Sequence, residues 1–325
     1  NTVMNPAAKI LAALRSTEHG VSGTDLCHQL GVSRAAVWSQ IESLREIGFE
    51  IVASPHQGYQ LVSSPDTLLA DDMMSRLGKV NVIGREIIVL EQTTSTNNEI
   101  EKAAMNGHEE GLVVFAESQT HGRGRMGRRW SSPAGKGLWF SFLLRPRLAP
   151  GECTQLTAAT ATALVRAIQD KTNISPEIKW PNDLMIQGKK VAGILTEMSA
   201  ELDKVRHVIV GIGINVNQTA SEFPAEIQST ATSLKLATGK NISRTDLAIT
   251  ILRELDQDYS RIVRGKFPAV ADEWASHCST LGKHVKIIVG RRRIIGRAEA
   301  LDESGALMLR TEHGRVERVT GGDLT

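Results

Sequence analysis

The sequence predicts an α+β protein of several domains: a winged helix-turn-helix at the N-terminus, a central mixed α/β domain and a small C-terminal β-barrel. Three patterns support this fold class. Helical periodicity over about the first 47 residues is followed by a hairpin pattern, strands alternate with helices from about residue 81, and short strands with tight turns follow residue 281. We expect domains at residues 1–63, 81–275 and 276–325, with a linker and short helix at 64–80.

The composition is that of an ordinary globular protein. The chain has 325 residues, 41% of them hydrophobic and 23% charged, which allows a buried core and suggests two or three domains. Its formal net charge of +2 is too small to indicate nucleic-acid binding by itself. The three cysteines, Cys27, Cys153 and Cys278, lie far apart without a CxxC pair, which argues against a disulfide framework or a zinc site.

The sequence contains no pattern typical of a membrane span or a secretion signal. No stretch approaches the roughly 18 apolar residues that a spanning helix needs, and the first residues lack the charged-then-apolar layout of a signal peptide. The scattered cysteines fit a reducing compartment. We therefore expect a soluble, cytoplasmic protein with no membrane partner.

The N-terminal pattern is that of a helix-turn-helix. A helix over 6–17 is followed by a short helix over 23–30 that ends at Gly31, and Ser33 is placed to cap a second helix over 33–47. The apolar side chains of that second helix recur at helical spacing and would face the core. Its outward face would enter the DNA major groove, and the candidate DNA-binding residues are Ser33, Arg34, Ala35, Trp38 and Ser39.

The next residues have the pattern of a wing. Segments 49–52 and 59–62 alternate around a Pro- and Gly-containing turn, as a hairpin does. One observation favours the alternative, a helical interaction module. Residues 1–62 hold four basic and five acidic side chains, a net charge of −1, whereas phosphate contacts need Lys and Arg. We expect this domain alone to bind DNA weakly and dimerisation to offset that weakness.

The rest of the chain divides into linker, α/β domain and β-unit. A short amphipathic helix is expected at 66–77, and longer helices beginning near 97 and over 152–171 and 245–264. Strands of the central domain are expected at 87–90, 112–116, 138–144, 178–186, 190–197 and 208–217. Those of the C-terminal β-unit, a small barrel, are expected at 285–289, 294–298, 306–309 and 316–319.

A basic loop at residues 121–130 is the most unusual stretch of the sequence. It contains four arginines and three glycines and no acidic residue. Glycines let a backbone approach a ligand closely, and arginine forks suit carboxylate and phosphate groups. The glycines match a dinucleotide fingerprint, but residues 128–133 begin no helical pattern, so we reject that interpretation. The alternative to an anion-binding loop is a solvated basic turn.

Three further segments carry candidate polar sites. Hydroxyl and amide side chains at 92–97 end a strand, where they could bind a small polar ligand or merely cap the next helix. Lys179 precedes Trp180-Pro181 in an apolar strand, and Pro181 indicates a bulge or an edge. A half-buried lysine needs an anion, which could be a ligand or Asp183. The alternating glycines of strand 208–217 leave room for a flat ligand or a neighbouring backbone.

These motifs together resemble the biotin protein ligases. The loop at 122–130, Lys-Trp-Pro-Asn-Asp at 179–183, Lys-Val-Ala-Gly-Ile-Leu at 190–195 and Gly-Ile-Gly-Ile-Asn at 211–215 occur in that family's order and spacing. Ser95-Thr96-Asn97 stands where the family keeps a Ser-Thr-Asn motif, although its usual preceding Asp is Thr94 here. The resemblance covers essentially the whole chain. Its N-terminal domain is similar to that of the bifunctional biotin operon repressors, and it implies a biotin/lipoate-ligase-type central domain and an SH3-like C-terminal domain.

The resemblance implies a two-step reaction. Biotin and ATP, with Mg²⁺ on the ATP phosphates and no metal assigned to protein residues, would give biotinyl-5′-AMP and pyrophosphate. Biotin would then pass to a lysine of a biotin carboxyl carrier protein. Fixed cations are what such a step requires, because negative charge builds on the phosphates, and no covalent enzyme nucleophile is needed.

The family's functional residues carry over by position. The catalytic candidates are Lys179, Arg123 and Arg125. The biotin-binding candidates are Ser95, Thr96, Asn97, Gln119, Gly122, Arg123, Gly124, Arg125 and Lys179. The nucleotide-binding candidates are Arg128, Trp130, Asn182, Asp183, Lys190 and Asn215. We expect the loop to be mobile when empty and to become ordered on binding ligand. The resemblance also implies operator DNA as a partner and a homodimer promoted by biotinyl-5′-AMP.

Three other functions remain open at this stage. A lipoate ligase would share the catalytic fold, but the Arg-Gly loop and residues 179–183 argue against it. A biotin-sensing transcription regulator without catalysis would not need Lys179 and the arginines. A ligase whose helix-turn-helix does not bind DNA would explain the acidic balance of residues 1–62.

Overall fold

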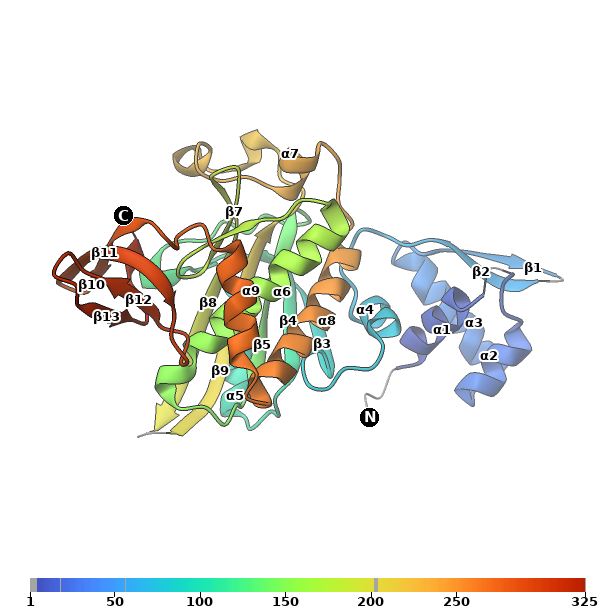
Figure 1. Cartoon of the computed structure of the whole chain (residues 1–325). Helices are drawn as coiled ribbons and strands as arrows, with labels where there is room; N and C mark the ends of the chain where they lie inside the picture. The colour runs from blue at the N-terminus through green and yellow to red at the C-terminus, as the bar shows by residue number, and fades with distance from the viewer. Residues whose placement is uncertain (1–4, 18, 56, 202–203, 325) are drawn as a thin grey trace. The chain divides into compact units, whose positions relative to one another are not determined.

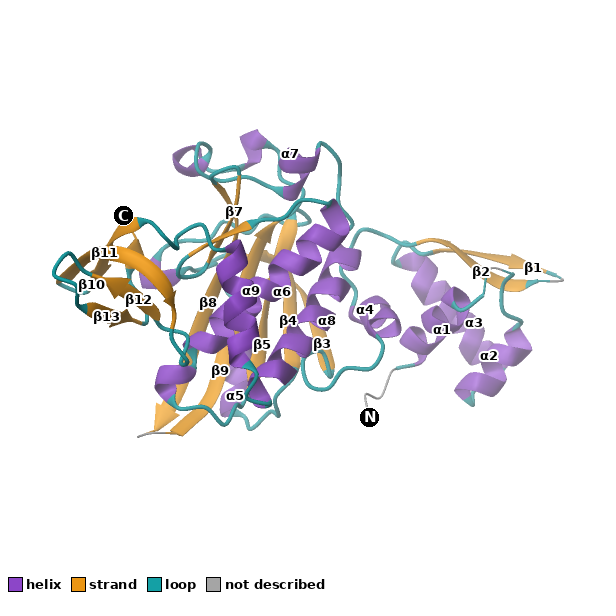
Figure 2. Cartoon of the chain, in the orientation of Figure 1, coloured by secondary structure: helices purple, strands orange, loops and turns teal. Residues whose placement is uncertain are grey.

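A computed structural model describes residues 5–17, 19–55, 57–201 and 204–324. The chain forms two compact units, Asn1–Lys79 and Val80–Thr325. Each unit is described by itself below, with its elements labelled in Figure 1 and coloured by type in Figure 2. Within the described residues, no helix is long and apolar enough to cross a membrane.

The first unit has three helices, a hairpin and a fourth helix. Its elements are α1 (Pro6–Arg15), α2 (Gly23–Leu30), α3 (Arg34–Glu46), β1 (Glu50–Ser54), β2 (Gly58–Ser63) and α4 (Ala70–Leu77). The predicted caps are present: Ser33 Oγ accepts from Ala36 N at 3.2 Å, and Gly31 ends α2 at φ 69°. The antiparallel β1–β2 pair forms the predicted wing, whose turn residue His56 lies outside the described residues.

The core of the first unit joins the helices to the hairpin. Ile10, Leu26 and Ile41, from three different helices, are fully buried in one cluster with Ile51 of β1. The predicted helix at 66–77 is shorter, at 70–77, and is more than a linker element. Arg15 of α1 forms an ion pair with the buried carboxylate of Asp72, so α4 packs against α1.

The second unit contains a seven-stranded mixed sheet in the order β3-β4-β5-β9-β8-β7-β6. Its strands are β3 (Glu86–Thr93), β4 (Leu112–Gln119), β5 (Gly137–Leu144), β6 (Glu177–Lys179), β7 (Asp183–Ile186), β8 (Lys189–Glu201) and β9 (Lys204–Asn215). The β3–β4 pair is parallel, as a connection through α5 (Thr96–Met105) allows, and the other neighbours are antiparallel. The predicted edge position of the Lys179 segment is confirmed, because β6 is the last strand.

Helices cover both faces of this sheet. The helices α6 (Thr154–Thr172), α8 (Arg244–Val263) and α9 (Phe267–His277) lie together on one face (Figure 1). Ile100 of α5 packs on Leu143 and Ile209, which point to the other face. The sequence analysis missed α9 and the short α7 (Leu234–Thr238), and its domain limit at 275/276 falls inside α9.

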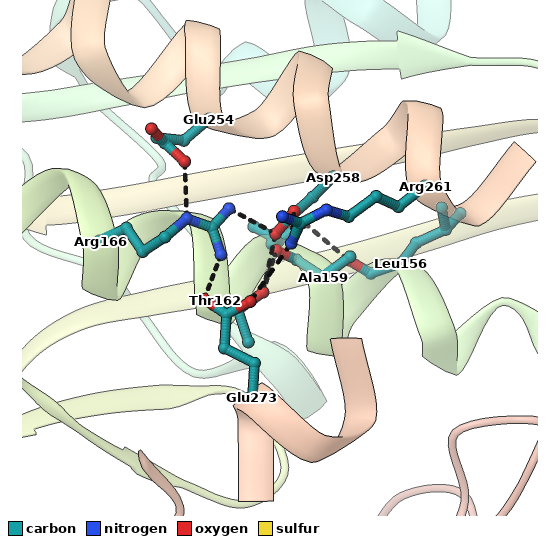
Figure 3. A network of polar contacts seen from close by, with 9 residues as sticks. Leu156, Ala159, Thr162, Arg166, Glu254, Asp258, Arg261 and Glu273 are labelled. Atoms are coloured by element: carbon teal, nitrogen blue, oxygen red, sulfur yellow. Dashed lines mark hydrogen bonds and ion pairs between the residues drawn. The ribbon is translucent and has the colours of Figure 1, made fainter. Parts of the chain in front are cut away.

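An ionic network joins the three helices of the first face (Figure 3). Arg166 of α6 contacts Glu254 at 2.6 Å and Asp258 at 2.8 Å, both on α8, and also pairs with Glu273 of α9. Arg261 adds contacts to Asp258 at 3.0 Å and to Glu273 at 3.3 Å. The Asp258 side chain is only 1% exposed, and this burial raises its pKa.

The C-terminal residues form a five-stranded antiparallel sheet in the order β13-β12-β11-β10-β14. Its strands are β10 (His284–Val289), β11 (Arg292–Leu301), β12 (Leu307–Arg310), β13 (Val316–Val319) and β14 (Asp323–Leu324). Four of these strands were predicted, and β14 was missed because it has only two residues. Thr154 Oγ1 at the start of α6 donates to the Ser304 carbonyl at 2.6 Å, which fastens this sheet to the central one.

Candidate functional site

The candidate site is a cavity of about 210 Å³ above strands β8 and β9. Its lining comes from the start of α5, the end of β4, the basic loop, β7, β8, β9 and the segment after β9. Thirteen of the predicted site residues line it: Ser95, Thr96, Asn97, Gln119, Arg123, Gly124, Arg125, Arg128, Trp130, Asn182, Asp183, Lys190 and Asn215. Two do not, Gly122 and Lys179.

One end of the cavity is a buried polar cluster at the start of α5. Gln119 Oε1 accepts from the Thr96 backbone N at 2.9 Å, and Gln119 Nε2 donates to Ser132 Oγ at 2.8 Å. The Thr96 hydroxyl lies 2.7 Å from Ser141 Oγ of β5. Ser95, the N-cap residue, is buried and its side chain makes no capping hydrogen bond. The capping alternative is therefore wrong for this segment, because these hydroxyls face the cavity and the sheet.

A carboxylate that the sequence analysis missed organises this end. Glu197 of β8 accepts from Asn97 Nδ2 at 2.6 Å and forms an ion pair with Arg123 at 2.9 Å. Arg123 also donates to Asn98 Oδ1. The alternating pattern of β8 gave no sign of this role, because Glu197 reads as an ordinary outward side chain. The guanidinium of Arg123 is thus held at the cavity wall and is half-neutralised there.

The basic loop begins no long helix. Residues 125–127 form one 3₁₀ turn, with Met126 and Gly127 in the left-handed region at φ 56° and 72°. Gly124 N donates to the Arg128 carbonyl at 2.7 Å, which closes the turn. A Cβ on Gly122 would lie 2.5 Å from the Trp130 carbonyl, so this glycine permits the close approach of the loop's two ends rather than contact with a ligand. The rejection of a dinucleotide fold is confirmed.

Two arginines of this loop contact the C-terminal sheet. Arg125 donates to the Gly322 carbonyl at 3.1 Å and to Asn182 Oδ1 at 3.3 Å. Arg128 forms an ion pair with Asp323 at 2.9 Å. Burial lowers the pKa of Arg125, while Asp323 and Asp183 act against that effect. Arg125 and Asn182 also line a second cavity of about 470 Å³, which extends toward the C-terminal sheet.

The glycines of β8 and β9 make room for a side chain of this chain. A Cβ on Gly213 would lie 2.5 Å from the Trp130 indole, and one on Gly193 would lie 3.0 Å from it. A Cβ on Gly211 would lie 2.1 Å from Asn97 Oδ1. The expectation of a flat ligand or a neighbouring backbone beside these glycines is corrected, because the Trp130 indole and the Asn97 carboxamide fill the space.

Charged groups surround the indole. Lys190 Nζ lies 5.3 Å from the Trp130 ring centroid and 2.6 Å from Asp183 Oδ1. The alternative pairing of Lys179 with Asp183 is therefore wrong. Lys179 ends β6 beside the cavity residues Asn182 and Asp183, and its ammonium has no polar partner among the described residues.

The segment after β9 supplies the other end of the cavity, which sequence analysis missed. The lining residues there are Gln218, Glu222, Phe223, Ile227, Thr230 and Ala231. Glu222 pairs with Lys136 at 2.8 Å, and this lysine and the Thr219 backbone N lower its pKa to about 2. Lys190 N donates to the Thr230 carbonyl at 2.8 Å, which holds the segment on β8. Its irregular pattern offered no periodic signal, and only its place directly after the glycine strand could have indicated it.

The first unit presents a separate surface on α3. Trp38 is 58% exposed, and Arg34, Ala35 and Ser39 are also at the surface of that helix. Ser33 is exposed and caps α3, as described above. The cations here are mostly engaged: Arg34 donates to Thr24 Oγ1 at 2.8 Å, and Arg45 donates to the Ile51 carbonyl at 2.8 Å.

Comparisons with known families agree with this architecture. Residues 7–60 match an HTH domain, residues 89–215 match the Biotin/lipoate A/B protein ligase family, and residues 280–324 match the Biotin protein ligase C terminal domain. Fold and site thus define a ligase-type catalytic domain that follows a helix-turn-helix.

Whole-chain relatives narrow the assignment. The bifunctional ligase/repressor BirA of Bacillus subtilis (strain 168) is 38% identical over 304 residues, which cover 94% of this chain and 93% of that protein. The bifunctional ligase/repressor BirA of Escherichia coli (strain K12) is 29% identical, covering 98% and 96%. The structure of the biotin protein ligase from Aquifex aeolicus in complex with biotin and ATP matches with a TM-score of 0.63 and 34% identity, over 74% of this chain and 97% of that one. The chain belongs to the biotin protein ligases, in the group of bifunctional ligase/repressors.

Proposed function

We propose that this ligase/repressor joins biotin to ATP, giving biotinyl-5′-AMP and pyrophosphate, and transfers biotin to a lysine of a carboxyl carrier protein. One observation carries the proposal: a single cavity brings together the Ser95–Asn97 cluster, the basic loop and the Trp130–Lys190–Asp183 group. A small polar head group, an anionic centre and a flat base each find matching chemistry along its length.

The biotin head group occupies the buried end. Ser95, Thr96, Asn97 and Gln119 supply fixed hydroxyl and amide groups there, and their positions are set by one another and by Ser141. The Glu197 carboxylate keeps Arg123 at the cavity wall. The biotin carboxylate then lies beneath the loop, next to Arg123, Gly124 and Arg125.

Adenylation takes place beneath the basic loop. An oxygen of the biotin carboxylate attacks the α-phosphorus of ATP, a P–O bond forms, and the bond to pyrophosphate breaks. Arg123 and Arg125 stabilise the charge that builds on the phosphate oxygens. Lys179, which has no partner among the described residues, turns toward the same oxygens when the ligands are bound. In the second step, the uncharged lysine amine of the carrier attacks the acyl carbon, AMP leaves, and the amine loses its proton.

The nucleotide occupies the part of the cavity around the indole. Trp130 offers the face or edge of its ring, and Lys190 and Arg128 supply positive charge near it. Asn182, Asp183 and Asn215 complete this group. Mg²⁺ accompanies the ATP phosphates. The described part of the chain holds no group of three metal-ligating side chains, and an ion that takes its oxygens from phosphates and water needs none.

The first unit, which we place at residues 1–63 with a linker region to 80, reads an operator through α3. Arg34, Ala35, Trp38 and Ser39 face the groove, and Ser33 fixes the start of the helix. Because few cations of this unit are free, one copy makes few phosphate contacts. A homodimer that forms when biotinyl-5′-AMP is bound doubles them. We place the catalytic domain at 81–275 and an SH3-like domain at 276–325.

The test is the ATP-dependent incorporation of labelled biotin into a biotin carrier domain. Labelling with ATP, and none without it, supports the ligase. Binding of biotin without any labelling would instead indicate a sensor that lacks catalysis. Replacing biotin by lipoate distinguishes the related lipoate ligases, whose activity would give lipoyl transfer.

One observation favours a second possibility for the N-terminal unit. Its acidic balance and its engaged arginines fit a ligase whose helix-turn-helix does not bind DNA. Selection of duplex DNA by the biotinyl-5′-AMP-loaded protein decides between the two, since a protein without operator binding enriches no sequence.

A further inference from the structure

The far end of the cavity holds a buried acceptor without a partner. Gln218 lines the cavity and is only 1% exposed, and among the described residues its Oε1 atom receives no hydrogen bond. Its backbone carbonyl is held by Ser233 Oγ at 2.6 Å, so the residue is fixed in place. A fixed, buried and unsatisfied oxygen in a ligand cavity indicates that the ligand supplies the missing donor.

A chain of hydrogen bonds determines which atom of Gln218 faces outward. The Thr232 carbonyl can only accept, so Asn215 must turn its Nδ2 toward it, at 3.0 Å. Asn215 Oδ1 then points to Gln218, which must turn its own Nε2 toward that oxygen, at 3.0 Å. Rotation of either carboxamide would bring two like groups together. The remaining atom of Gln218 is therefore an acceptor and not a donor.

The position of Gln218 along the cavity identifies the part of the ligand that it meets. Gly211 of β9 lies against Asn97 of the buried polar end, Gly213 lies against the Trp130 indole, and Asn215 begins the relay. At about 3.3 Å per residue, Gly211 and Asn215 are roughly 13 Å apart. With the head group at one end and phosphates in the middle, the base lies at the other end.

We propose that Gln218 selects the nucleobase by accepting a hydrogen bond from an exocyclic amino group, as adenine has at C6, and that Asn215 is the positioning residue that orients it. The proposal rests on the proposed ligase function. A base with an oxo group at C6 would bring a second acceptor against Oε1, and a base with only hydrogen there would leave Oε1 unsatisfied. Asn215, whose amide nitrogen and oxygen are both engaged within the chain, acts through Gln218.

The test compares nucleotides that differ only at C6. Initial rates of pyrophosphate release are measured with biotin and ATP, purine riboside triphosphate (hydrogen at C6) or inosine triphosphate (oxo at C6). We expect kcat/KM for ATP to exceed that for purine riboside triphosphate about tenfold, the worth of one neutral hydrogen bond, and that for inosine triphosphate by more. Equal use of ATP and purine riboside triphosphate by the unaltered protein would overturn the proposal.

Substitutions test the residue itself. In Gln218→Met, which keeps the volume and removes the acceptor, the ratio for ATP over purine riboside triphosphate should fall to about one. Gln228→Met is the matched control, because Gln228 lies on the same segment but outside the cavity lining and should keep the tenfold ratio. A tenfold ratio retained in Gln218→Met would contradict the proposal.

Two further measurements keep the outcomes separate. Thermal stabilisation by biotin alone should be unchanged in Gln218→Met, since biotin binds at the other end. If that variant does not fold, Asn215→Ala replaces it: a lowered ratio supports the relay, and an unchanged ratio contradicts it. Absence of pyrophosphate with every nucleotide in the unaltered protein would overturn the ligase function, and this proposal with it.

Discussion

Lys179 is the charged residue whose surroundings explain it least without a ligand. It ends an edge strand next to Asn182 and Asp183, and the carboxylate that could have paired with it, Asp183, is engaged by Lys190 at 2.6 Å. A partly buried ammonium without an anion costs free energy. A substrate phosphate or carboxylate supplies that anion in our account.

Lys179→Ala should therefore abolish adenylation while leaving the fold intact. Pyrophosphate release in a single turnover should fall by at least ~100-fold, as for loss of a fixed cation at a reacting phosphate, and the thermal midpoint should stay within about 2 °C. Lys189→Ala, an exposed lysine at a hairpin turn, serves as the control. A parallel loss of thermal stability would mean that Lys179 has a structural ion pair instead.

Arg125 differs from Lys179 because its guanidinium already has partners. Its hydrogen bonds to Asn182 and Gly322 hold it at the cavity wall. Arg125→Ala removes one charge-assisted contact to the adenylate, about 1.5–3 kcal/mol, so biotinyl-5′-AMP should dissociate roughly 10- to 150-fold faster. Filter retention of labelled adenylate measures this rate, with Arg291→Ala on the distant β10–β11 turn as control. Unchanged retention would refute the role.

At the scale of elements, the sequence predicted most helices and strands but not the cavity's far end. Helix α3 was predictable because Ser33 caps it and its apolar residues recur at helical spacing. Helix α9 was missed although Pro268 stands in its first turn, where proline begins a helix rather than breaking it. The segment at 218–231 has no period, and its contribution depends on tertiary hydrogen bonds to β8 and β9.

The same limit applies to individual site residues. The motifs placed thirteen candidates in one cavity, because each motif ends a strand at the same edge or lies in the loop above it. Sequence could not predict that Glu197 holds Arg123, since that contact joins residues 74 positions apart. Nor could it show that Gly213 accommodates an indole of the same chain.

Gly213→Ala tests that packing. A Cβ at this position would lie 2.5 Å from the Trp130 ring, so the indole must move from its place over β9. Overpacking of this kind costs about 1–3 kcal/mol, and we expect the KM for ATP to rise roughly 5- to 150-fold with biotin binding little changed. Gly151→Ala, where nothing lies within 4 Å, is the control. An unchanged KM for ATP would contradict this role of the indole.

The ionic network of α6, α8 and α9 makes its own prediction. Arg166→Met leaves the buried Asp258 without its main partner and should lower the free energy of unfolding by about 3–5 kcal/mol at pH 7. Burial raises the pKa of Asp258 in the folded protein. In the variant, the folded state therefore binds a proton more readily than the unfolded state, and the deficit should shrink as the pH falls toward 5. Urea unfolding at both pH values measures it, and a deficit that grows at low pH would contradict the assignment.

At the scale of the whole molecule, one ligand has to serve two activities. The cavity that makes biotinyl-5′-AMP belongs to the second unit, whereas Trp38 and its neighbours belong to the first. The first unit has few free cations, so DNA binding has to come from two copies acting together. The adenylate, as product of the first step and signal for assembly, links the activities in our account.

The most direct measurement of that link is DNA binding by Lys179→Ala, on a duplex selected by the unaltered protein. Fluorescence anisotropy is recorded with biotin and ATP, and separately with saturating preformed biotinyl-5′-AMP. We predict that the unaltered protein binds DNA under both conditions, and that the variant binds only when the adenylate is supplied. If the variant binds equally well with biotin and ATP, or if the unaltered protein needs neither ligand, repression does not depend on the product of this site.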